Sequence, residues 1–491
     1  MLDPKEEDLE KLAETCLATA RQIKEYLAAN KQPQPTFDQN GPSTFPAATL
    51  EIQQARLDLR TAARRLYDLA SGPEDIVTWH LYQSCHDLNA LRYVFHYNIH
   101  TAVPLDGTIT YTDLASKLSL DASQLKQMLR QLMPIHVFTE PTPGHVAHTA
   151  SSRLLATDAG IASYTGFMVE GTFPYAAGQI ETFEKWGHGR PEPNRTAVSH
   201  YYDTDLSMFE YFETRAPAVR DRFARLMTHM SSNPLMANRH VASGFEWSSL
   251  PPDGVVVDVA GGLGHCSIPI AEATAPTVKV IVQDLPQIIA RAGDPATCVI
   301  PEPLRSRFEF MAHDFYAPQP VKGAAVYFLR MILHSYSDAY ALRILRNIIP
   351  SMTATSKLVI MDQVMPPAVN TLPEPLERIK RSQDLQMMLL CNAKERDEAE
   401  WADLFARAGE GLVLEDAEEA EERTKLGILA IRTPPGSMMS LIEVGFVRRG
   451  GGGVAGGGVA GGDGGGGGGV ADGGVDDGAG VNTTTVENGE A

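Results

Sequence analysis

The sequence predicts a doubly wound α/β domain in its C-terminal half, preceded by a mostly helical region that includes a winged-helix order of elements. The first observation is that apolar strand-like runs alternate with helical patterns from Gly254 onward. Runs that are apolar on both faces and separated by helices are typical of a parallel sheet covered on both sides. The second observation is a glycine-rich turn that follows the first of these runs. The third is that residues 1–250 show mainly helical spacing of apolar side chains.

The composition excludes several classes of protein. The chain has 491 residues, of which 43% are hydrophobic, and a net charge of −19. That length is ample for a buried core, and the acidic charge disfavours nucleic acid and anionic membrane surfaces as partners. The N-terminal stretch MLDPKEEDLE does not resemble a secretory or transit peptide, and no apolar run approaches the ~18 residues that span a bilayer. We therefore expect a cytoplasmic protein.

The cysteines argue against a disulfide framework or a zinc site. They are odd in number and widely scattered, with no CxxC spacing, which fits a reducing compartment. They are Cys16, Cys85, Cys266, Cys298 and Cys391.

Five regions follow one another along the chain. Apolar spacing predicts helices over 4–30 and from 47 to about 70, joined by a proline-rich link. In 103–156 the order is short strand, helix, helix and two strands, and Asp121 is the expected N-cap of the second helix. This order is typical of a winged helix, and the second helix lacks a basic cluster for DNA. The predicted regions are 1–79 (N-terminal helices and linker), 80–160 (winged-helix-like dimerisation domain), 161–250 (helical connector and substrate-pocket region), 251–447 (cofactor-binding domain) and 448–491 (disordered acidic, glycine-rich tail).

The strands of the C-terminal domain are expected at regular intervals. A Pro-Gly link between the last two predicts an antiparallel hairpin at the edge of the sheet. The charge-dense insert 415–425 is expected to be a solvated helix or loop. The predicted strands are 255–260, 278–284, 308–314, 324–333, 357–364, 426–432 and 440–446.

The glycine-rich turn VVVDVAGGLGH (255–265) predicts a nucleotide-type ligand. Its glycines let the backbone approach a ligand, and the helix behind it offers free N–H groups. It is not a Walker loop, and Ser267 breaks the GxGxxG pattern of many NAD enzymes. Asp284 ends the next strand, where an acid can accept both ribose hydroxyls, and Asp258 would suit a cationic amino-acid end better than a pyrophosphate.

The third strand ends in an acid and an aromatic residue, Asp314 and Phe315, which suit an adenine amine and ring. Together with Asp258, they favour S-adenosylmethionine over NAD as the cofactor. An NAD-dependent oxidoreductase remains an alternative at this point.

Several motifs in register resemble small-molecule O-methyltransferases of the caffeate type, and in particular the fungal polyketide branch. The motifs are VVVDVAGGLGH, VQDLP (282–286), HDF (313–315), LRMILHSYSD (329–338) and NAKERDEAEW (392–401). The resemblance covers roughly 85–446. It implies a class I, Rossmann-like methyltransferase domain with a mixed, mainly parallel sheet, a winged-helix dimerisation domain, a homodimer, and no metal.

The resemblance also assigns roles to residues by position. Gly261 and Gly262 lie in the S-adenosylmethionine loop, and Arg330 is a basic residue near the cofactor. His334 aligns with the catalytic base, and Glu395 and Asp362 align with two acids that flank it. Glu395 is our preferred orienting acid.

Four residues near these motifs have other expected roles. Ala260 stands where many members have a glycine, and Asp338 is expected to be the N-cap of the helix after His334. Met387 and Met388 either wall the substrate or pack in the core.

Two functions remain as hypotheses beside the NAD enzyme. The first is methyl transfer from S-adenosylmethionine to a phenolic, polyketide-derived hydroxyl, with His334 as base. A free imidazole has a pKa near 6.5 and a phenol near 10, so an acid that raises the histidine pKa would assist proton removal. The second is a winged-helix regulator with a vestigial methyltransferase domain, which the intact set of catalytic residues disfavours.

Overall fold

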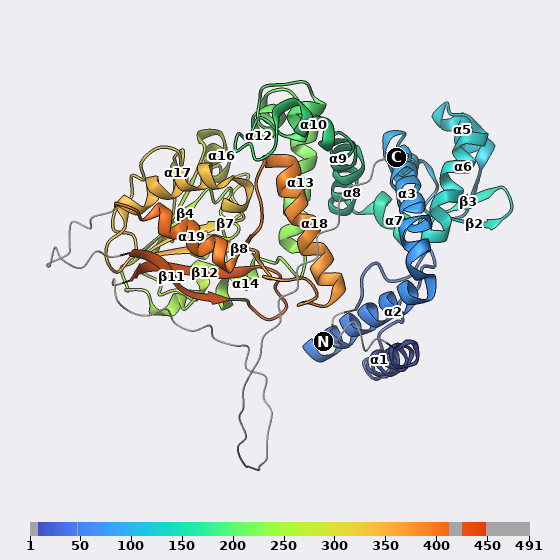
Figure 1. Cartoon of the computed structure of the whole chain (residues 1–491), viewed down its shortest axis with the longest axis horizontal. Coiled ribbons are helices and arrows are strands. Elements are labelled where there is room, and N and C mark those ends of the chain that lie inside the picture. Colours follow the sequence, from blue (N-terminus) through green and yellow to red (C-terminus); the bar gives the residue numbers. More distant parts are fainter. Residues whose placement is uncertain (1–7, 47, 412–424, 448–491) are drawn as a thin grey trace, which may run out of the picture. The chain divides into compact units, whose positions relative to one another are not determined.

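The computed structural model describes residues 8–46, 48–411 and 425–447, and these contain the predicted helical region and α/β domain (Figure 1). The predicted disordered tail 448–491 and all of the insert 415–425 except Lys425 lie outside the described residues. Within the described part of the chain, no helix is both long and apolar enough to cross a membrane.

The N-terminal helices differ from the sequence prediction mainly at their ends. The first begins at Leu9, where Asp8 caps it by accepting from the N–H of Glu10. The second continues past residue 70 to Val77. Its backbone kinks at Gly72 (φ 78°), and the residues after the kink are helical again. The elements are α1 (Leu9–Ala29), α2 (Leu50–Val77), α3 (Trp79–His96) and α4 (Ile99–Ala102).

The predicted winged-helix order is present. β1 precedes the two helices and β2 and β3 follow them, and the three strands form a small antiparallel sheet of order β1-β3-β2. Asp121 caps α6 as expected, accepting from the N–H of Gln124 at 2.8 Å. Arg130 on α6 pairs with Glu140 through two hydrogen bonds of 2.7 and 2.8 Å. The elements are β1 (Ile109–Thr110), α5 (Tyr111–Leu118), α6 (Ala122–Leu132), η2 (Met133–Ile135), β2 (Thr139–Thr142) and β3 (His145–Ala147).

A run of mostly short helices connects this region to the α/β domain, as the sequence predicts. Several of them build an aromatic and methionine-rich core with the later helix α18 (Glu374–Cys391). The elements are α7 (Ala150–Thr157), α8 (Ala159–Phe167), η3 (Met168–Thr172), α9 (Phe173–Ala177), α10 (Gln179–Trp186), α11 (Ala197–Tyr201), α12 (Met208–Thr214), α13 (Pro217–Ser232), α14 (Arg239–Ser243) and η4 (Trp247–Ser249).

The α/β domain is built on a seven-stranded sheet of order β11-β12-β8-β7-β4-β5-β6. β4 to β8 pair in parallel, whereas β12 pairs antiparallel with both β8 and β11. All seven predicted strands are confirmed, with ends shifted by a few residues. The strands are β4 (Val255–Val259), β5 (Lys279–Asp284), β6 (Phe308–Ala312), β7 (Val326–Arg330), β8 (Lys357–Asp362), β11 (Lys425–Arg432) and β12 (Ser440–Val447).

Helices cover both faces of this sheet, which explains why its central strands are mostly apolar (Figure 1). Successive strand residues point to opposite faces: Val257 packs in the cluster with α17 and α19, and Val256 packs in the cluster with α14, α15 and η4. The remaining elements are α15 (Ser267–Ala273), α16 (Pro286–Ala292), η5 (Glu302–Arg307), η6 (Leu333–Ser335), α17 (Asp338–Ile348), η7 (Ile349–Ser351), β9 (Val364–Met365), β10 (Arg396–Asp397) and α19 (Glu398–Ala408).

The close approach of α14 to the sheet gives a stability prediction. A Cβ added at Gly244, the C-cap of α14, would collide with the side chain of Leu441, which is 1% exposed on β12. We expect Gly244→Ala to lower the free energy of unfolding by about 1–3 kcal/mol through overpacking, measured as a lower urea midpoint.

Gly293→Ala is the matched control. Gly293 is also a helix C-cap with negative φ, but a Cβ there would lie 3.5 Å from the carbonyl oxygen of Ile289, an ordinary contact. We expect its midpoint to stay near that of the wild type. Equal midpoints for the two variants would contradict the packing described at α14.

Candidate active site

The strand order places the predicted site residues at one edge of the sheet. The chain runs outward from β4 to β5 and β6, and then returns to the other side of β4 to form β7 and β8. Parallel sheets bind ligands outside the carboxyl ends of their strands, where this order reverses. The turn after β4 and the turn after β7 therefore meet at the reversal, and these two turns hold the glycines and His334.

The turn after β4 brings its backbone close to Asp258 and leaves open space beyond Gly262. A Cβ at Gly261 would lie 2.5 Å from the carboxyl carbon of Asp258, whereas one at Gly262 (φ 62°) would meet nothing within 4 Å. Ala260 has φ 58°, a conformation that costs a non-glycine residue roughly 1–2 kcal/mol. The alanine is therefore accommodated with backbone strain.

The two acids beside this turn have different surroundings. Asp284 is half-buried, and its carboxylate accepts from the N–H of Gly262 at 2.9 Å and of Leu285 at 2.7 Å. Asp258 is 1% exposed and accepts from the hydroxyl of Ser267 at 2.6 Å. Burial raises the pKa of Asp284, and raises that of Asp258 to about 7. Asp258 thus supports the turn from beneath, and its predicted contact with a ligand stays a prediction.

Arg330 joins three segments at the end of β7. Its guanidinium donates to the carbonyl oxygen of Met236 and to Sγ of Cys266 at 3.4 Å, and it lies near Sδ of Met439. Its Nε is buried and has no acceptor among the described residues. One donor of this side chain is therefore unpaired among the described residues.

The predicted adenine-side pair lies beyond β6. Asp314 is exposed and accepts from the N–H of Tyr316 at 2.9 Å. The ring of Phe315 packs edge-on against Tyr316 and Tyr336, with centroids 5.0 and 5.6 Å apart. Phe315 is thus held by an aromatic cluster that reaches the segment following His334.

His334 and Glu395 form a buried pair. His334 lies in η6, four residues beyond the end of β7, and is 4% exposed, while Glu395 is 3% exposed just before β10. Nδ1 of His334 is 2.8 Å from Oε1 of Glu395. A carboxylate accepts only, so Nδ1 carries the hydrogen and Nε2 is the nitrogen left to accept a proton. The structure thus brings the preferred orienting acid into contact with the predicted base.

Charge around His334 outweighs burial in setting its pKa. Burial lowers that pKa, but the carboxylates of Glu395 and Asp362 and the hydrogen bond to Glu395 raise it to about 9. Asp362 is 0% exposed, and neither of its carboxylate oxygens has a hydrogen-bond partner among the described residues. Burial raises the pKa of Asp362 to about 6, against the effect of His334. Asp362 therefore acts on His334 through its charge and makes no hydrogen bond to the ring.

Several polar residues that the sequence analysis did not single out hold Glu395 in place. Its N–H donates to Asp384 at 2.9 Å, and Nε2 of Gln363 lies 3.4 Å from its Oε1. Lys380 is buried nearby and donates to the carbonyl oxygens of Met438 and Val364, and burial lowers its pKa to about 8. Lys380 sits in a charged helical stretch that has the pattern of a solvated face, so the sequence offers no signal for it.

One expected role is corrected. Ser337, not Asp338, occupies the N-cap of α17. The carboxylate of Asp338 pairs with Arg396 instead, at 2.8 Å from its Nη2. Asp338 is therefore the first residue of the helix and an ion-pair partner of the segment that carries Glu395.

The two methionines of α18 are partly explained. Met387 is 8% exposed and packs in the connector core, and its sulfur accepts from the hydroxyl of Ser335 at 3.8 Å, next to His334. Met388 is half-buried. Met387 therefore belongs to the core and also lies beside the turn that carries the histidine.

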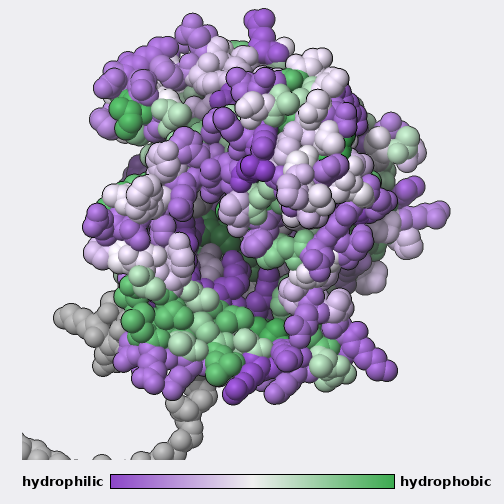
Figure 2. Space-filling view, turned by 90° about the vertical axis from the view of Figure 1, so that its right-hand side faces the viewer, coloured by the Kyte–Doolittle hydropathy of each residue, from purple (hydrophilic) through white to green (hydrophobic). Residues whose placement is uncertain are grey.

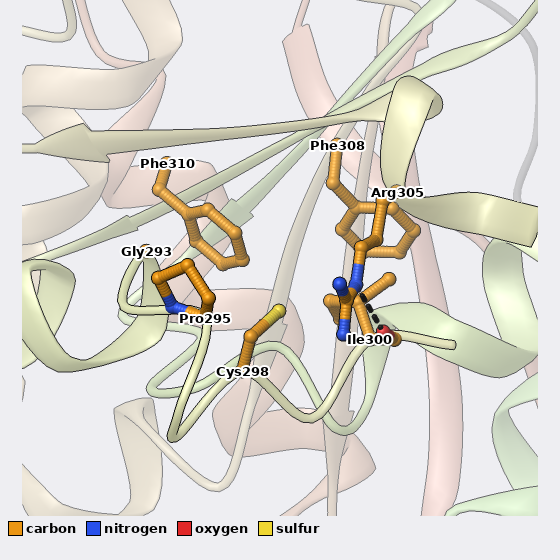
Figure 3. A pocket seen from close by; sticks show the side chains of 7 residues that line it. All are labelled: Gly293, Pro295, Cys298, Ile300, Arg305, Phe308 and Phe310. Carbon is orange, nitrogen blue, oxygen red and sulfur yellow. Dashed lines mark hydrogen bonds between the residues drawn. The ribbon is translucent and has the colours of Figure 1, made fainter. Parts of the chain in front are cut away.

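A separate cavity lies beside β6 and contains none of the predicted site residues (Figure 3). Phe308 and Phe310 line it together with Cys298, and Arg305 lies at its side with its Nε bonded to the carbonyl oxygen of Ile300 at 3.1 Å. Its lining is mostly apolar. The histidine and the glycine-rich turn lie outside it.

Two family models match this chain. One, described as an O-methyltransferase dimerisation domain, matches residues 79–158, and the other, an O-methyltransferase domain, matches residues 189–410. Among similar proteins, O-methyltransferase pgmB of Aspergillus terreus is 36% identical over 440 residues, 89% of this chain and 95% of that protein. O-methyltransferase bik3 of Gibberella fujikuroi is 34% identical over 85% of this chain and 88% of that protein.

Solved structures share the fold. OxaC in complex with SAH and oxaline aligns with a TM-score of 0.65 and 21% identity, over 89% of this chain and 98% of that one. LepI in complex with SAM aligns with a TM-score of 0.63 and 24% identity, over 89% of this chain and 100% of that one.

The pair of His334 and Glu395 predicts how His334 titrates in the protein without ligands. Glu395→Gln removes the negative charge that most raises the pKa of His334, so we expect that pKa to fall by about 1–3 units from its value of about 9. The measurement is an NMR titration of the ring carbons in protein labelled at histidine. Glu309→Gln, at an exposed position on β6, should leave the titration unchanged. An unaltered His334 titration in Glu395→Gln would contradict the pairing.

Proposed function

The chain belongs to the S-adenosylmethionine-dependent O-methyltransferase family of fungal secondary metabolism, and on that premise we propose that it methylates a hydroxyl of a phenolic, polyketide-type metabolite with His334 as general base. The observation that carries this proposal is the buried contact of 2.8 Å between His334 and Glu395. This assignment to the family replaces the alternative of an NAD enzyme, and the buried pair of His334 and Glu395 speaks against a vestigial regulator.

The residues around the glycine-rich turn fit the cofactor. Open space beyond Gly262 lets a ligand approach the backbone, and the carboxylate of Asp284 has lone pairs left to accept from ribose hydroxyls. The free Nε of Arg330 supplies a donor for an anionic group. We propose that Gly261, Gly262, Asp284 and Arg330 hold the cofactor, and that Asp258 supports their turn.

The adenine side completes this assignment. Asp314 would accept from the exocyclic amine, and Phe315 would cover one face of the ring. Leu285 follows Asp284 and is 44% exposed, so it offers an apolar surface beside the ribose. S-adenosylmethionine, when bound, supplies an electrophilic methyl group.

His334 provides the proton transfer. A phenol has a pKa near 10 and a free imidazole near 6.5, a gap of about 3.5 units or roughly 5 kcal/mol. With the pKa of His334 at about 9, the gap falls to about 1 unit, or roughly 1.4 kcal/mol. Glu395 fixes the tautomer, so that Nε2 takes the proton of the acceptor hydroxyl while that oxygen bonds to the transferred methyl group.

The raised pKa has a cost at neutral pH. Only neutral His334 can accept a proton, and below pH 9 most of it is protonated. The fraction of competent enzyme therefore increases with pH, by about tenfold per unit, until the pH passes about 9.

A phenolic panel tests the function. We expect incubation with isotope-labelled S-adenosylmethionine to give a labelled methyl ether of at least one polyketide-type phenol, detected by mass spectrometry. His334→Ala should lower kcat by about 10²–10⁴-fold, the usual range for loss of a general base. Its affinity for S-adenosylhomocysteine should stay within about twofold of the wild type in calorimetry, because the ring lies outside the proposed cofactor contacts.

Three outcomes would contradict the proposal. Full turnover by His334→Ala would remove the histidine from its role. A kcat/KM that does not rise between pH 6 and 9 would show that neutral His334 is not the competent form. Methylation only of non-aromatic alcohols would exclude the phenolic substrate class.

We also propose that the protein is a homodimer. The helix α3 opens the segment matched as a dimerisation domain, and it exposes Trp79, Leu81 and Tyr82 by 57%, 66% and 61%. Large exposed apolar patches mark interaction surfaces. The exposed apolar side chains continue onto the two helices before it, including Leu9, Leu17, Leu50, Tyr67, Leu69, Ile76 and Val77. Figure 2 shows hydrophobic residues gathered in a band at the foot of this side of the molecule.

Introducing negative charge on this surface tests the dimer. We expect the double variant Trp79→Glu, Leu81→Glu to sediment as a monomer at a micromolar concentration where the wild type is a dimer, because two buried carboxylates per subunit would oppose association. Gln124→Glu adds a charge at an exposed position of α6 and should remain dimeric. A wild type that is monomeric at this concentration, or a dimeric double variant, would contradict this assignment.

A further inference from the structure

Arg396 is a fully buried cation in the segment that carries Glu395. Its side chain is 0% exposed, and its guanidinium lies 5.1 Å from the ring of Trp401. A guanidinium has five N–H donors in a fixed plane. Here they reach two carbonyl oxygens and one carboxylate, so the side chain acts as a branched clamp.

The acceptors of this clamp lie on both sides of His334. Nη1 donates to the carbonyl oxygen of Leu333 at 2.9 Å, and Nη2 donates to that of Tyr336 at 2.9 Å. Nε and Nη2 also donate to Oδ1 of Asp338, at 3.0 and 2.8 Å. The turn from Leu333 to Asp338 is therefore tied to Arg396 at three points, and His334 lies between the first two.

The other end of the clamp lies in a separate two-stranded sheet. Arg396 begins β10, which pairs in parallel with β9, and the next residue, Asp397, caps α19. Glu395 precedes Arg396 directly. The clamp thus connects the backbone that carries the acid to the backbone that carries the histidine, beside the bond between their side chains.

We propose that Arg396 is a positioning residue that sets the distance between His334 and Glu395, with Asp338 as its anchor. The inference rests on the proposed role of His334 as base. Met331, two residues before that turn, has φ 55°, a strained conformation that persists only where the surroundings impose it. Lysine, with one ammonium, lacks the planar fork that reaches three acceptors in fixed directions.

The charged groups that face His334 determine how the variant should be read. They are Glu395, Asp362 and Arg396 itself, while Lys380 acts on Glu395. Arg396→Lys keeps one positive charge near the ring, so the direct electrostatic effect of residue 396 is retained. A change in the titration of His334 would then report a changed contact with Glu395.

The experiment compares two conservative substitutions. Arg396→Lys should lower kcat by about 10–100-fold, the loss that a misplacement of about 1 Å can produce, with the affinity for S-adenosylhomocysteine unchanged within about twofold. The rising limb of kcat/KM should move at least one pH unit lower, because His334 loses the carboxylate that raises its pKa.

Arg307→Lys is the matched control. Arg307 is also a buried arginine fork, 8% exposed, which binds the carbonyl oxygens of Val278 and Ala271 and the hydroxyl of Thr274. It lies at the start of β6, the opposite edge of the same sheet from His334. We expect Arg307→Lys to lower the melting temperature, while kcat and the pH range over which kcat/KM rises stay as in the wild type. The proposal would be overturned if the two substitutions changed kcat equally, or if kcat/KM of Arg396→Lys rose over the same pH range as that of the wild type.

A second variant covers the case in which Arg396→Lys does not fold. Asp338→Ala removes the anchor and leaves the arginine in place. It should also move the rise of kcat/KM to lower pH, by a smaller amount than Arg396→Lys. Asp338→Asn keeps an accepting oxygen and should behave more like the wild type. If kcat/KM of Asp338→Ala rose over the same pH range as that of the wild type, the roles of both the anchor and the clamp would be overturned.

The NMR titration of His334 separates this inference from the proposed function. If the panel reveals no methylated phenol, a fall in the pKa of His334 in Arg396→Lys, with no fall in Arg307→Lys, still supports the clamp. If methyl transfer occurs and the titration is the same in all three proteins, the clamp is wrong and the function stands.

Discussion

The hydrogen bond between Nδ1 of His334 and Oε1 of Glu395 joins two ionisable groups that are both removed from water. A charge buried without a partner is very costly, and removing one member of a buried pair is strongly destabilising. The surrounding polar residues are therefore a condition for the pair to exist. Gln363, Lys380 and Asp384 surround the acid, and Arg396 supports the histidine turn, so that the acid and the histidine turn are each held by other groups.

The same burial explains why the three acids near the site differ. Glu395 has a cationic partner and hydrogen bonds, Asp258 has a hydroxyl, and Asp362 has no hydrogen-bond partner among the described residues. Burial raises the pKa of Asp362 to about 6 and that of Asp258 to about 7. Pairs of groups whose environments separate their pKa values are typical of sites that move protons. The acids are thus distinguished by their surroundings and not by residue type.

The strands and the glycine-rich turn could be predicted from the sequence because their signals are local. An apolar run such as 255–260 has few alternatives, and the order of motifs then placed His334 and Glu395 together. Contacts between distant segments were less predictable. Asp338 has the local pattern of an N-cap, but tertiary pairing with Arg396 competes with that role, and Ser337 takes it instead. Lys380 lies on a charged helix, so only the packing of α18 against later loops reveals that it is buried.

The position of β12 has a consequence for how the domain is made. This strand, Ser440–Val447, is the last in the described chain, yet it lies inside the sheet between β8 and β11. During synthesis the helical N-terminal region can fold early, since domains generally fold as units from the N-terminus. The edge of β8, however, stays unpaired until residue 447 has left the ribosome. Until then, that edge is open to pairing with other chains, so the order of synthesis leaves the α/β domain with an unprotected strand edge until its last described strand is made.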